Sequence, residues 1–79
     1  MRKSIHTRPY RAFKTLLKEV RVAKGMTQGD LARKLRVHQS HISKCEAGER
    51  RLDVLELRKW CEALSLPLAR FVERLEDRL

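Results

Sequence analysis

The sequence predicts a single all-α domain made of five short helices. Apolar residues recur three and four positions apart along most of the chain, and no segment shows the strict alternation of a strand. Sequence patterns typical of helix N-termini occur at Thr27, His38 and Asp53. The segments between the predicted helices are short, as in a compact cluster of helices. A chain of 79 residues buries roughly 60% of the surface that its unfolded form exposes, which leaves room for one small core and excludes a multi-domain enzyme.

The first helix is predicted from periodicity alone. Its apolar positions recur at helical spacing and end before Gly25, a residue type that commonly follows the last turn of a helix. These positions are Phe13, Leu16, Leu17, Val20 and Ala23. Residues 1–10 contain six polar or basic side chains before Pro9 and are predicted to form a flexible basic arm, so that residues 11–79 make up the folded domain.

The second and third helices are predicted to follow Thr27 and His38. Thr27 and Asp30 form a capping box, in which the hydroxyl accepts from an amide three residues on, and this predicts a helix over 28–35. His38 stands before a predicted helix over 39–46, although histidine is a less favoured capping residue than Ser, Thr, Asn or Asp. The positions predicted to face the core are Leu31, Leu35, Val37, Ile42 and Cys45, with the small Ala32 where the two helices cross.

Two more helices complete the prediction. Asp53 and Glu56 repeat the capping box and begin a helix over 54–64. Pro67 suits the start of a last helix. The apolar residues of that helix are Leu68, Phe71, Val72, Leu75 and Leu79.

Positive charge is concentrated in the first half of the chain. The formal net charge is +9 at pH 7. Residues 1–36 contain 11 Lys and Arg against two acidic residues, whereas residues 37–79 contain eight of each sign. A one-sided basic surface attracts phosphate polyanions, which are either nucleic acids or anionic lipids.

Several classes of protein are excluded. No apolar run is long enough to span a membrane, and the basic N-terminus lacks the apolar segment of a signal peptide, so we expect a cytoplasmic protein with no membrane partner. Cys45 and Cys61 lack the spacing of metal ligands, and His6, His38 and His41 are joined by no Cys or carboxylate at such spacing. Because no Ser/His/Asp or Cys/His constellation occurs either, we expect no metal, no cofactor and no enzymatic activity.

The stretch 28–46 has the pattern of a helix-turn-helix DNA reader. Two short helices joined by a short turn follow a basic amphipathic helix. If the apolar positions of the second helix face the core, the side chains that face outward are Gln39, Ser40, Ser43 and Lys44. All of them form hydrogen bonds: Gln can bridge N6 and N7 of adenine, Lys can donate to O6 and N7 of guanine, and Ser can serve either.

Two segments carry a family resemblance. They read KGMTQGDLA over residues 24–32 and VHQSHISKCEAGER over residues 37–50. From about residue 12 to residue 75 the chain resembles the Xre-type helix-turn-helix family, which includes lambdoid phage repressors and Cro. The resemblance implies the five-helix DNA-binding domain of lambda repressor-like proteins.

The resemblance also implies roles for single residues. Gln39, Ser40, Ser43 and Lys44 would read base edges in the major groove, and Glu46 would form a structural ion pair with a basic residue of the first helix, here Arg21. Gln28 would contact a backbone phosphate together with the amides at its helix N-terminus. The full set expected at phosphates is Thr27, Gln28, Arg36, His38, Arg50 and Arg51.

The sequence departs from the family pattern at its turns. Arg36 stands where the turn usually has Gly, and a left-handed backbone there would cost on the order of 1 kcal/mol. A phosphate contact by Arg36 could recover part of that cost. His38 replaces the usual Ser or Thr cap, and Ser65 replaces the usual Gly after the fourth helix.

The implied function is that of a transcriptional regulator of prokaryotic or phage type, a repressor that binds double-stranded DNA as a homodimer on a palindromic operator. One recognition helix reads only a few base pairs, and two half-sites one helical turn apart multiply the specificity. The candidate dimer interface is the last helix, although its apolar residues can equally serve to close the core. Those residues are Leu68, Phe71, Val72, Leu75 and Leu79.

Two alternatives stay open. The chain could be an antitoxin that represses its own operon and also binds a toxin protein through an exposed apolar patch. It could also bind RNA or a membrane surface without sequence preference. The second alternative ranks last, because most of the few aromatic residues fall at core positions and leave no stacking platform for single strands.

Overall fold

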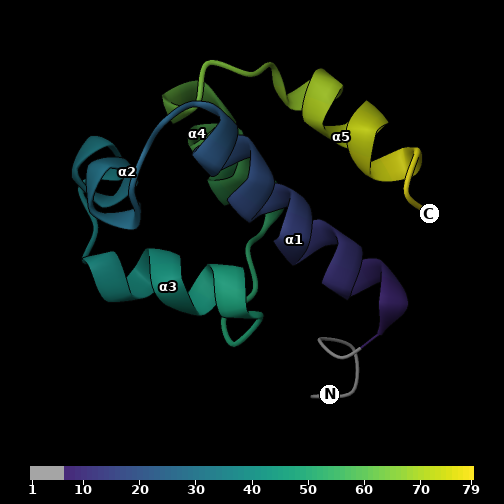
Figure 1. The fold of residues 1–79 in the computed structure, drawn as a ribbon, viewed down its shortest axis with the longest axis horizontal. Coiled ribbons are helices and arrows are strands. Elements are labelled where there is room, and N and C mark those ends of the chain that lie inside the picture. Colours follow the sequence, from purple (N-terminus) through teal and green to yellow (C-terminus); the bar gives the residue numbers. More distant parts are fainter. Residues whose placement is uncertain (1–6) are drawn as a thin grey trace.

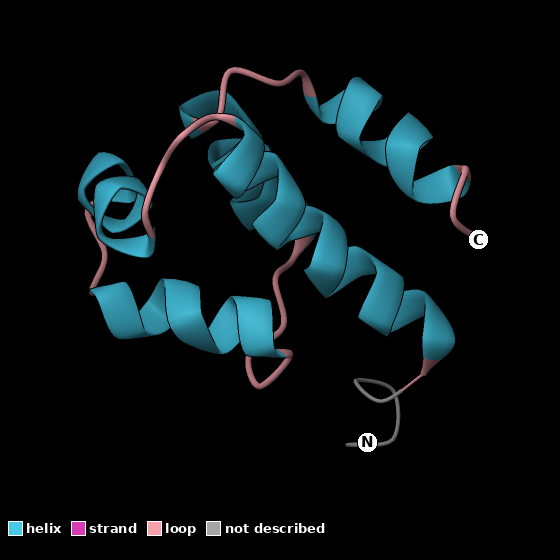
Figure 2. Cartoon of the chain, in the orientation of Figure 1, coloured by secondary structure: helices cyan, strands magenta, loops and turns pink. Residues whose placement is uncertain are grey.

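Residues 7–79 are described by the computed structural model of the chain, and they form five helices joined by short loops (Figures 1 and 2). The helices are α1 (Arg8–Ala23), α2 (Gln28–Leu35), α3 (Gln39–Ala47), α4 (Val54–Ala63) and α5 (Leu68–Glu76). No strand occurs within this range. The predicted all-α class and the five predicted helices are therefore confirmed.

The start of α1 differs from the prediction. The predicted arm extended to residue 10, whereas α1 begins at Arg8. The Thr7 hydroxyl accepts a hydrogen bond from the Tyr10 amide at 3.3 Å, and Pro9 fits the first turn of a helix because its missing amide would have no helical partner there. The predicted boundary at residue 11 thus lies too far along the chain. The earlier part of the predicted arm, residues 1–6, falls outside the described residues.

Both predicted capping boxes are formed. In α2 the Asp30 amide donates to the Thr27 hydroxyl at 3.0 Å, and the Thr27 amide donates to the Asp30 carboxylate at 2.9 Å. Asp53 and Glu56 make the same reciprocal pair at the start of α4, at 2.8 and 2.9 Å. His38 makes no side-chain hydrogen bond to α3, so this helix begins without the roughly 1 kcal/mol that a capping side chain contributes.

The turns after α2 and α4 are left-handed at residues that carry side chains. Arg36 has φ 58° and ψ 44°, and Ser65 has φ 55°. The Arg36 conformation allows the Val37 amide to donate to the Ala32 carbonyl at 3.0 Å, which closes the end of α2 and turns the chain toward α3. The left-handed conformation considered for Arg36 from the sequence is therefore present, at a cost of about 1 kcal/mol.

One core receives side chains from every helix. Its buried apolar residues are Leu16, Leu17, Val20, Leu31, Ala32, Ile42, Cys45, Leu57, Trp60, Cys61, Leu64 and Phe71. Two predicted core positions differ. Leu35 is only partly buried, and the prediction for Val37 is wrong because this residue is 37% exposed. Val37 follows the left-handed turn, so it lies with Leu35 and Trp60 along a surface cleft and does not enter the core.

α1 runs through the middle of the molecule (Figure 1). It contacts α3 and α5, while α2 packs against both α3 and α4. Arg78, just beyond α5, pairs with Glu19 of α1 and joins the end of the chain to the central helix. This arrangement supports α3 from α1 and α2 and leaves its remaining surface open to solvent.

Candidate nucleic-acid interface

α2 and α3 form the predicted helix-turn-helix unit. Ala32, on α2, is buried, so its small side chain permits close packing of the neighbouring helices. Ile42 and Cys45 lie on the inner face of α3 and are buried in the core. Because these inner positions fix the rotation of α3 about its own axis, they also decide which of its side chains reach solvent.

The open face of α3 carries the side chains that the sequence predicted to face outward. Gln39, Ser40, Ser43 and Lys44 are all exposed. Their amide, hydroxyl and ammonium groups match the donors and acceptors on base edges in a major groove, which is wide enough to admit a helix. The predicted orientation is thus present, and the assignment of base reading to these residues stays a prediction.

A buried ion pair ties α3 to α1, as the resemblance implied. Arg21 donates from Nε to Oε2 of Glu46 at 2.6 Å and from NH2 to Oε1 at 3.0 Å, and the two side chains are only 8% and 4% exposed. The third nitrogen of Arg21 donates to the Met26 carbonyl at 2.7 Å. The carboxylate of Glu46 is therefore neutralised inside the protein, where it does not repel a phosphate backbone.

Gln28 makes a contact within the protein that the sequence did not predict. Its side-chain amide donates to Oε1 of Glu46 at 3.1 Å, so the first residue of α2 belongs to the same network. A side-chain amide has two N–H donors, and this contact uses one of them. Gln28 also lines a cleft of about 750 Å³ at the start of α2, together with Arg33 and Gln39. Two predicted contact residues, Gln28 from α2 and Gln39 from α3, therefore meet in one place.

Lys14 makes a further polar contact between α1 and α3. Its ammonium donates to the Ala47 carbonyl in the last turn of α3 at 3.2 Å. Its stem packs against Gly48, where φ is +83° and an added Cβ would lie 3.0 Å from Lys14 Cδ. A cation at this carbonyl end also complements the helix dipole. The spacing of Lys14 and Arg21, seven residues apart on α1, is the only sequence signal that could have indicated this role.

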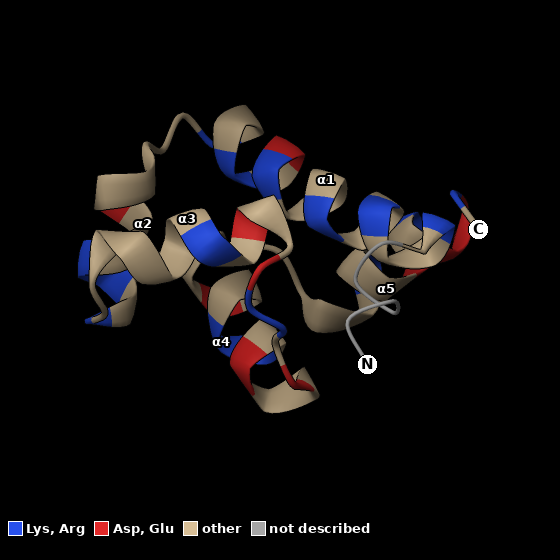
Figure 3. Cartoon of the chain, turned by 90° about the horizontal axis from the view of Figure 1, so that it is seen from below, with Lys and Arg blue, Asp and Glu red and all other residues tan. Residues whose placement is uncertain are grey.

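Two of the arginines predicted to contact phosphate have partners within the protein. Arg50 forms an ion pair with Glu56 at 3.1 Å, and the guanidinium of Arg51 lies 5.3 Å from the ring centre of Tyr10. Arg36 and His38 are exposed in the turn before α3. Figure 3 shows basic segments on α1 and on α2, on either side of α3. Both helices that contact α3 therefore carry basic residues.

His41 lies on α3 but is not part of its open face. It is half-buried in the cleft that contains Arg50, Glu56 and Trp60. Burial lowers the pKa of His41 below its usual value, and Arg50 adds to the shift while Glu56 opposes it. The shift favours the neutral form of His41.

The predicted dimer residues of α5 fall into three groups. Phe71 is only 1% exposed and packs edge-to-face on Phe13 at 5.9 Å, so its assignment to an interface is corrected to the core. Leu68 and Leu75 are half-buried, and Val72 and Leu79 are exposed. Among the described residues, the large apolar side chain with the greatest exposure is that of Leu55 on α4 at 69%, next to exposed Val54, and the sequence did not single it out. The apolar periodicity of the sequence did not separate Val54 and Leu55 from core residues, because they lie in a helix that also contributes to the core.

Two further findings concern metals and membranes. Within residues 7–79, no three His, Cys, Asp or Glu side chains come together as they would around a metal ion. No helix in the same range has both the length and the apolar character needed to cross a bilayer.

Comparison with known proteins gives a consistent picture. A helix-turn-helix family model matches residues 17–71. An XRE-family like protein from Pseudomonas syringae pv. tomato str. DC3000 is 41% identical, with a TM-score of 0.85 over 95% of this chain and 92% of that one. No curated protein sequence matches the chain.

A restriction-modification controller protein, C.Esp1396I, also has a similar structure. Its wild-type form is 29% identical, with a TM-score of 0.83 over 91% of this chain and 95% of that one. The tetramer of the same controller in complex with its natural 35 base-pair operator is also 29% identical, with a TM-score of 0.82 over the same shares of 91% and 95%.

Proposed function

This chain belongs to the XRE-type helix-turn-helix family of DNA-binding transcriptional regulators, and from that premise we propose that it is a repressor that binds a palindromic operator as a homodimer. The observation that carries the proposal is the open face of α3, where four hydrogen-bonding side chains stand on a helix whose inner face is fixed in the core. Repression follows when such a protein occupies DNA that RNA polymerase must use.

We assign base reading to Gln39, Ser40, Ser43 and Lys44. Gln39 is the first residue of α3, and the N-terminal part of a recognition helix is the part that enters the major groove. The ion pair of Arg21 with Glu46 supports this assignment, because it sets the position of the opposite end of α3. Each good contact between a side chain and a base contributes about 1–3 kcal/mol of discrimination.

We assign phosphate contacts to the surroundings of α3. The amides at the start of α2 and the second N–H of Gln28 lie beside Gln39 in one cleft, and a helix N-terminus favours an anion. Arg36 and His38 are exposed in the turn between the two helices. The full assigned set is Thr27, Gln28, Arg36, His38, Arg50 and Arg51. Binding to duplex DNA should accordingly fall steeply with salt.

The homodimer rests on two supports. The similar controller C.Esp1396I forms a tetramer on its operator, which shows that a protein of this fold can assemble on DNA. In this chain, Val72 and Leu79 of α5 are exposed apolar residues of the kind that an interface covers. Sedimentation should give a dimer for the wild type and a monomer for the Val72→Glu/Leu79→Glu variant. The exposed Arg70→Glu variant is the control, and a wild type that is monomeric both free and on DNA would exclude the dimer.

One experiment tests base reading. Selection from random duplex DNA gives the preferred site, and its symmetry and half-site spacing test the palindrome. On that site Gln39→Ala should weaken binding by about 1–3 kcal/mol, with little effect on random duplex. The exposed Thr15→Ala variant on α1 serves as the control. Equal losses on selected and random DNA would show that Gln39 does not read bases.

The antitoxin function is the second candidate, and one observation favours it. Val54 and Leu55 form an exposed apolar pair at the start of α4, which is the type of surface that a protein partner covers. Purification of the protein from its native host should then recover a stoichiometric toxin, and Leu55→Lys should release that toxin without loss of DNA binding. Recovery of the chain alone from cells that express it at its natural level would exclude this function.

A further inference from the structure

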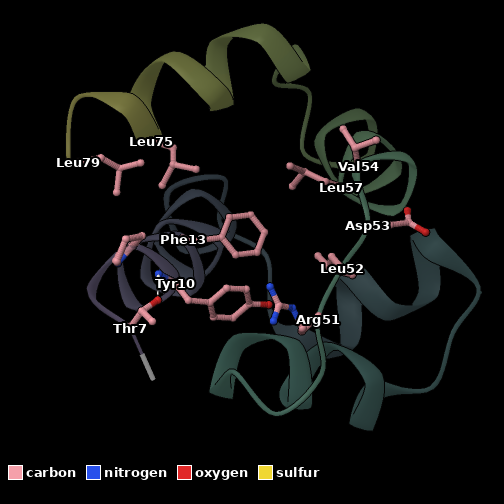
Figure 4. A pocket seen from close by; sticks show the side chains of 11 residues that line it. Thr7, Tyr10, Phe13, Arg51, Leu52, Asp53, Val54, Leu57, Leu75 and Leu79 are labelled. Atoms are coloured by element: carbon pink, nitrogen blue, oxygen red, sulfur yellow. Dashed lines mark hydrogen bonds between the residues drawn. The ribbon is translucent and has the colours of Figure 1, made fainter. Parts of the chain in front are cut away.

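Two hollows of the surface differ in the residues that they bring together. A cavity of about 450 Å³ between α1, α4 and α5 is lined by Tyr10, Phe13 and Leu75, and it includes Leu79 (Figure 4). Because Leu79 is one of the proposed dimer residues, a second copy of the chain would cover this cavity. The cleft of about 750 Å³ at the start of α2 instead joins the two helices of the helix-turn-helix unit at Gln39, the first residue of α3.

Gly29 leaves an open point in the first turn of α2, and the side chain of Gln39 lies against it. A Cβ atom at Gly29 would stand 3.5 Å from Oε1 of Gln39. It would stand 3.7 Å from NH1 of Arg33 and from Oγ1 of Thr27. The helix itself gains nothing from glycine, which destabilises a helix relative to alanine. What the glycine provides is room for the amide group of Gln39 beside the backbone of α2.

The groups around this point favour the oxygen of the Gln39 amide over its nitrogen. The guanidinium of Arg33 is held along α2 by its NH2, which donates to Oδ1 of Asp30 at 2.5 Å, and its NH1 lies beside Gly29. The Thr27 hydroxyl accepts the Asp30 amide, so its own hydrogen is left to donate. The first amides of a helix add partial positive charge. The carboxylate of Asp30 does not line the cleft.

The orientation of the amide decides which of its groups remain for DNA. Oxygen and nitrogen are the two ends of one planar amide, so an oxygen that faces α2 leaves the NH2 group for a base. An NH2 group only donates. In the major groove guanine presents two acceptors, N7 and O6, whereas adenine presents the acceptor N7 and the donor N6. The donor of adenine would meet no acceptor from Gln39.

We infer that Gly29 and Arg33 determine specificity, because they hold the Gln39 amide with its oxygen toward α2 and so make Gln39 select a G·C pair over an A·T pair. The inference rests on the proposed function, in which Gln39 reads a base. It differs from the bidentate contact with adenine, for which glutamine turns both its oxygen and its nitrogen to the base. Arg33 acts through Gln39 and is a positioning residue.

Competition binding with duplexes that differ at one base pair tests the preference. On the site selected from random DNA, the pair read by Gln39 is the one whose substitution no longer changes the affinity of Gln39→Ala. At that pair the wild type should prefer G·C to A·T by about tenfold. Replacement of the guanine by 7-deazaguanine, which lacks the N7 acceptor, should weaken the wild type severalfold and leave Gln39→Ala unchanged.

Variants at the two positions separate orientation from overall affinity. Arg33→Met should weaken binding to both duplexes and reduce the preference to about twofold or less. The matched control is Arg58→Met, because Arg58 is also an exposed arginine paired with an acid of its own helix, Glu62 at 3.1 Å, and lies outside the cleft. Gly29→Ala adds an atom at ordinary contact distance and should keep the preference. Gly29→Leu, also a better helix former than glycine, fills the place of the amide and should abolish it.

NMR of the full chain without DNA tests the orientation separately from the proposed function. Cross-relaxation between the NH2 protons of Gln39 and the Hα protons of Gly29 should be weak, because the NH2 group faces away from α2. Strong cross-relaxation would overturn the orientation. An A·T pair at the position read by Gln39, or an unchanged preference in Arg33→Met, would overturn the role in specificity. Weak cross-relaxation in a chain that selects no DNA site would show that the proposed function fails while the orientation stands.

Discussion

Replacement of Arg21 by methionine is expected to be among the most damaging single changes at a charged residue. Arg21 makes two hydrogen bonds to Glu46 and one to the Met26 carbonyl, and both charged side chains are almost fully buried. Arg21→Met leaves the buried carboxylate with the Gln28 amide as its one remaining side-chain partner among residues 7–79. Removal of one member of a buried ion pair typically costs about 3–5 kcal/mol. A protein of this size has a total stability of only about 4–12 kcal/mol, so the loss is a large part of the whole.

The double variant Arg21→Met/Glu46→Met separates the buried charge from the packing. Because both charges are then absent, the remaining loss should be at most about 2 kcal/mol, mainly from the Met26 carbonyl and the Gln28 amide that lose a partner. The single changes should therefore add up to much more than the double change. The difference, a coupling free energy of about 2 kcal/mol or more, measures the interaction itself.

Urea unfolding followed by circular dichroism gives these free energies, with an osmolyte present if Arg21→Met does not fold in buffer alone. The control is Arg33→Met, which breaks the exposed ion pair with Asp30 at 2.5 Å and should cost at most about 1 kcal/mol. A loss of stability in Arg21→Met as small as that in Arg33→Met would refute the reasoning from burial.

Three further predictions follow from the polar contacts and the buried thiols. Lys14→Met should destabilise the fold by about 1 kcal/mol, because the Ala47 carbonyl loses its donor. It should leave the salt dependence of DNA binding unchanged, whereas Arg36→Met should reduce the slope of log binding constant against log salt concentration by about 0.9. Equal slopes for the two variants would contradict these roles. Burial raises the pKa of Cys45 and of Cys61 to about 11, so a thiol reagent at pH 8 should react only as fast as the protein unfolds, and rapid labelling of the native state would be inconsistent with the packing. The hydrogen bonds from Thr27 lower the pKa of Asp30 in the folded protein below its usual 3.8. The Asp30 carboxylate therefore stabilises the fold fully above pH 3.8, and this stabilisation is lost as the pH falls through the lower pKa of the folded state. Asp30→Asn should destabilise the fold at pH 7, and the difference in unfolding free energy between wild type and variant should shrink only in that acidic range.

The parts of the fold that depend on neighbouring residues were predictable from the sequence. The capping boxes of Thr27 and Asp53 are signals confined to four residues, and α2 and α4 begin where these signals place them. The start of α1 was misplaced because Thr7 and Pro9 are equally common in loops. Val37 was misplaced because an apolar residue after a left-handed turn can lie on either side of it.

The parts of the candidate site that depend on contacts between residues far apart in the sequence were harder to predict. The pair of Arg21 with Glu46 was reached only through the family resemblance, since nothing in the spacing of these residues joins them. The contact of Lys14 with Ala47 joins residues 33 positions apart, and the cavity beside Tyr10 is formed by several separate segments. Such features arise from the packing of helices, which periodicity does not specify.

The separation of the two faces of α3 has a consequence for how such proteins diversify. The inner face and the ends of α3 hold it in place, whereas its outward side chains contribute almost nothing to the core. Changes among those side chains can therefore accumulate without unfolding the protein, and under the proposed base-reading role they would change the preferred DNA sequence. The same property makes the chain a frame into which the outward residues of another regulator could be transplanted.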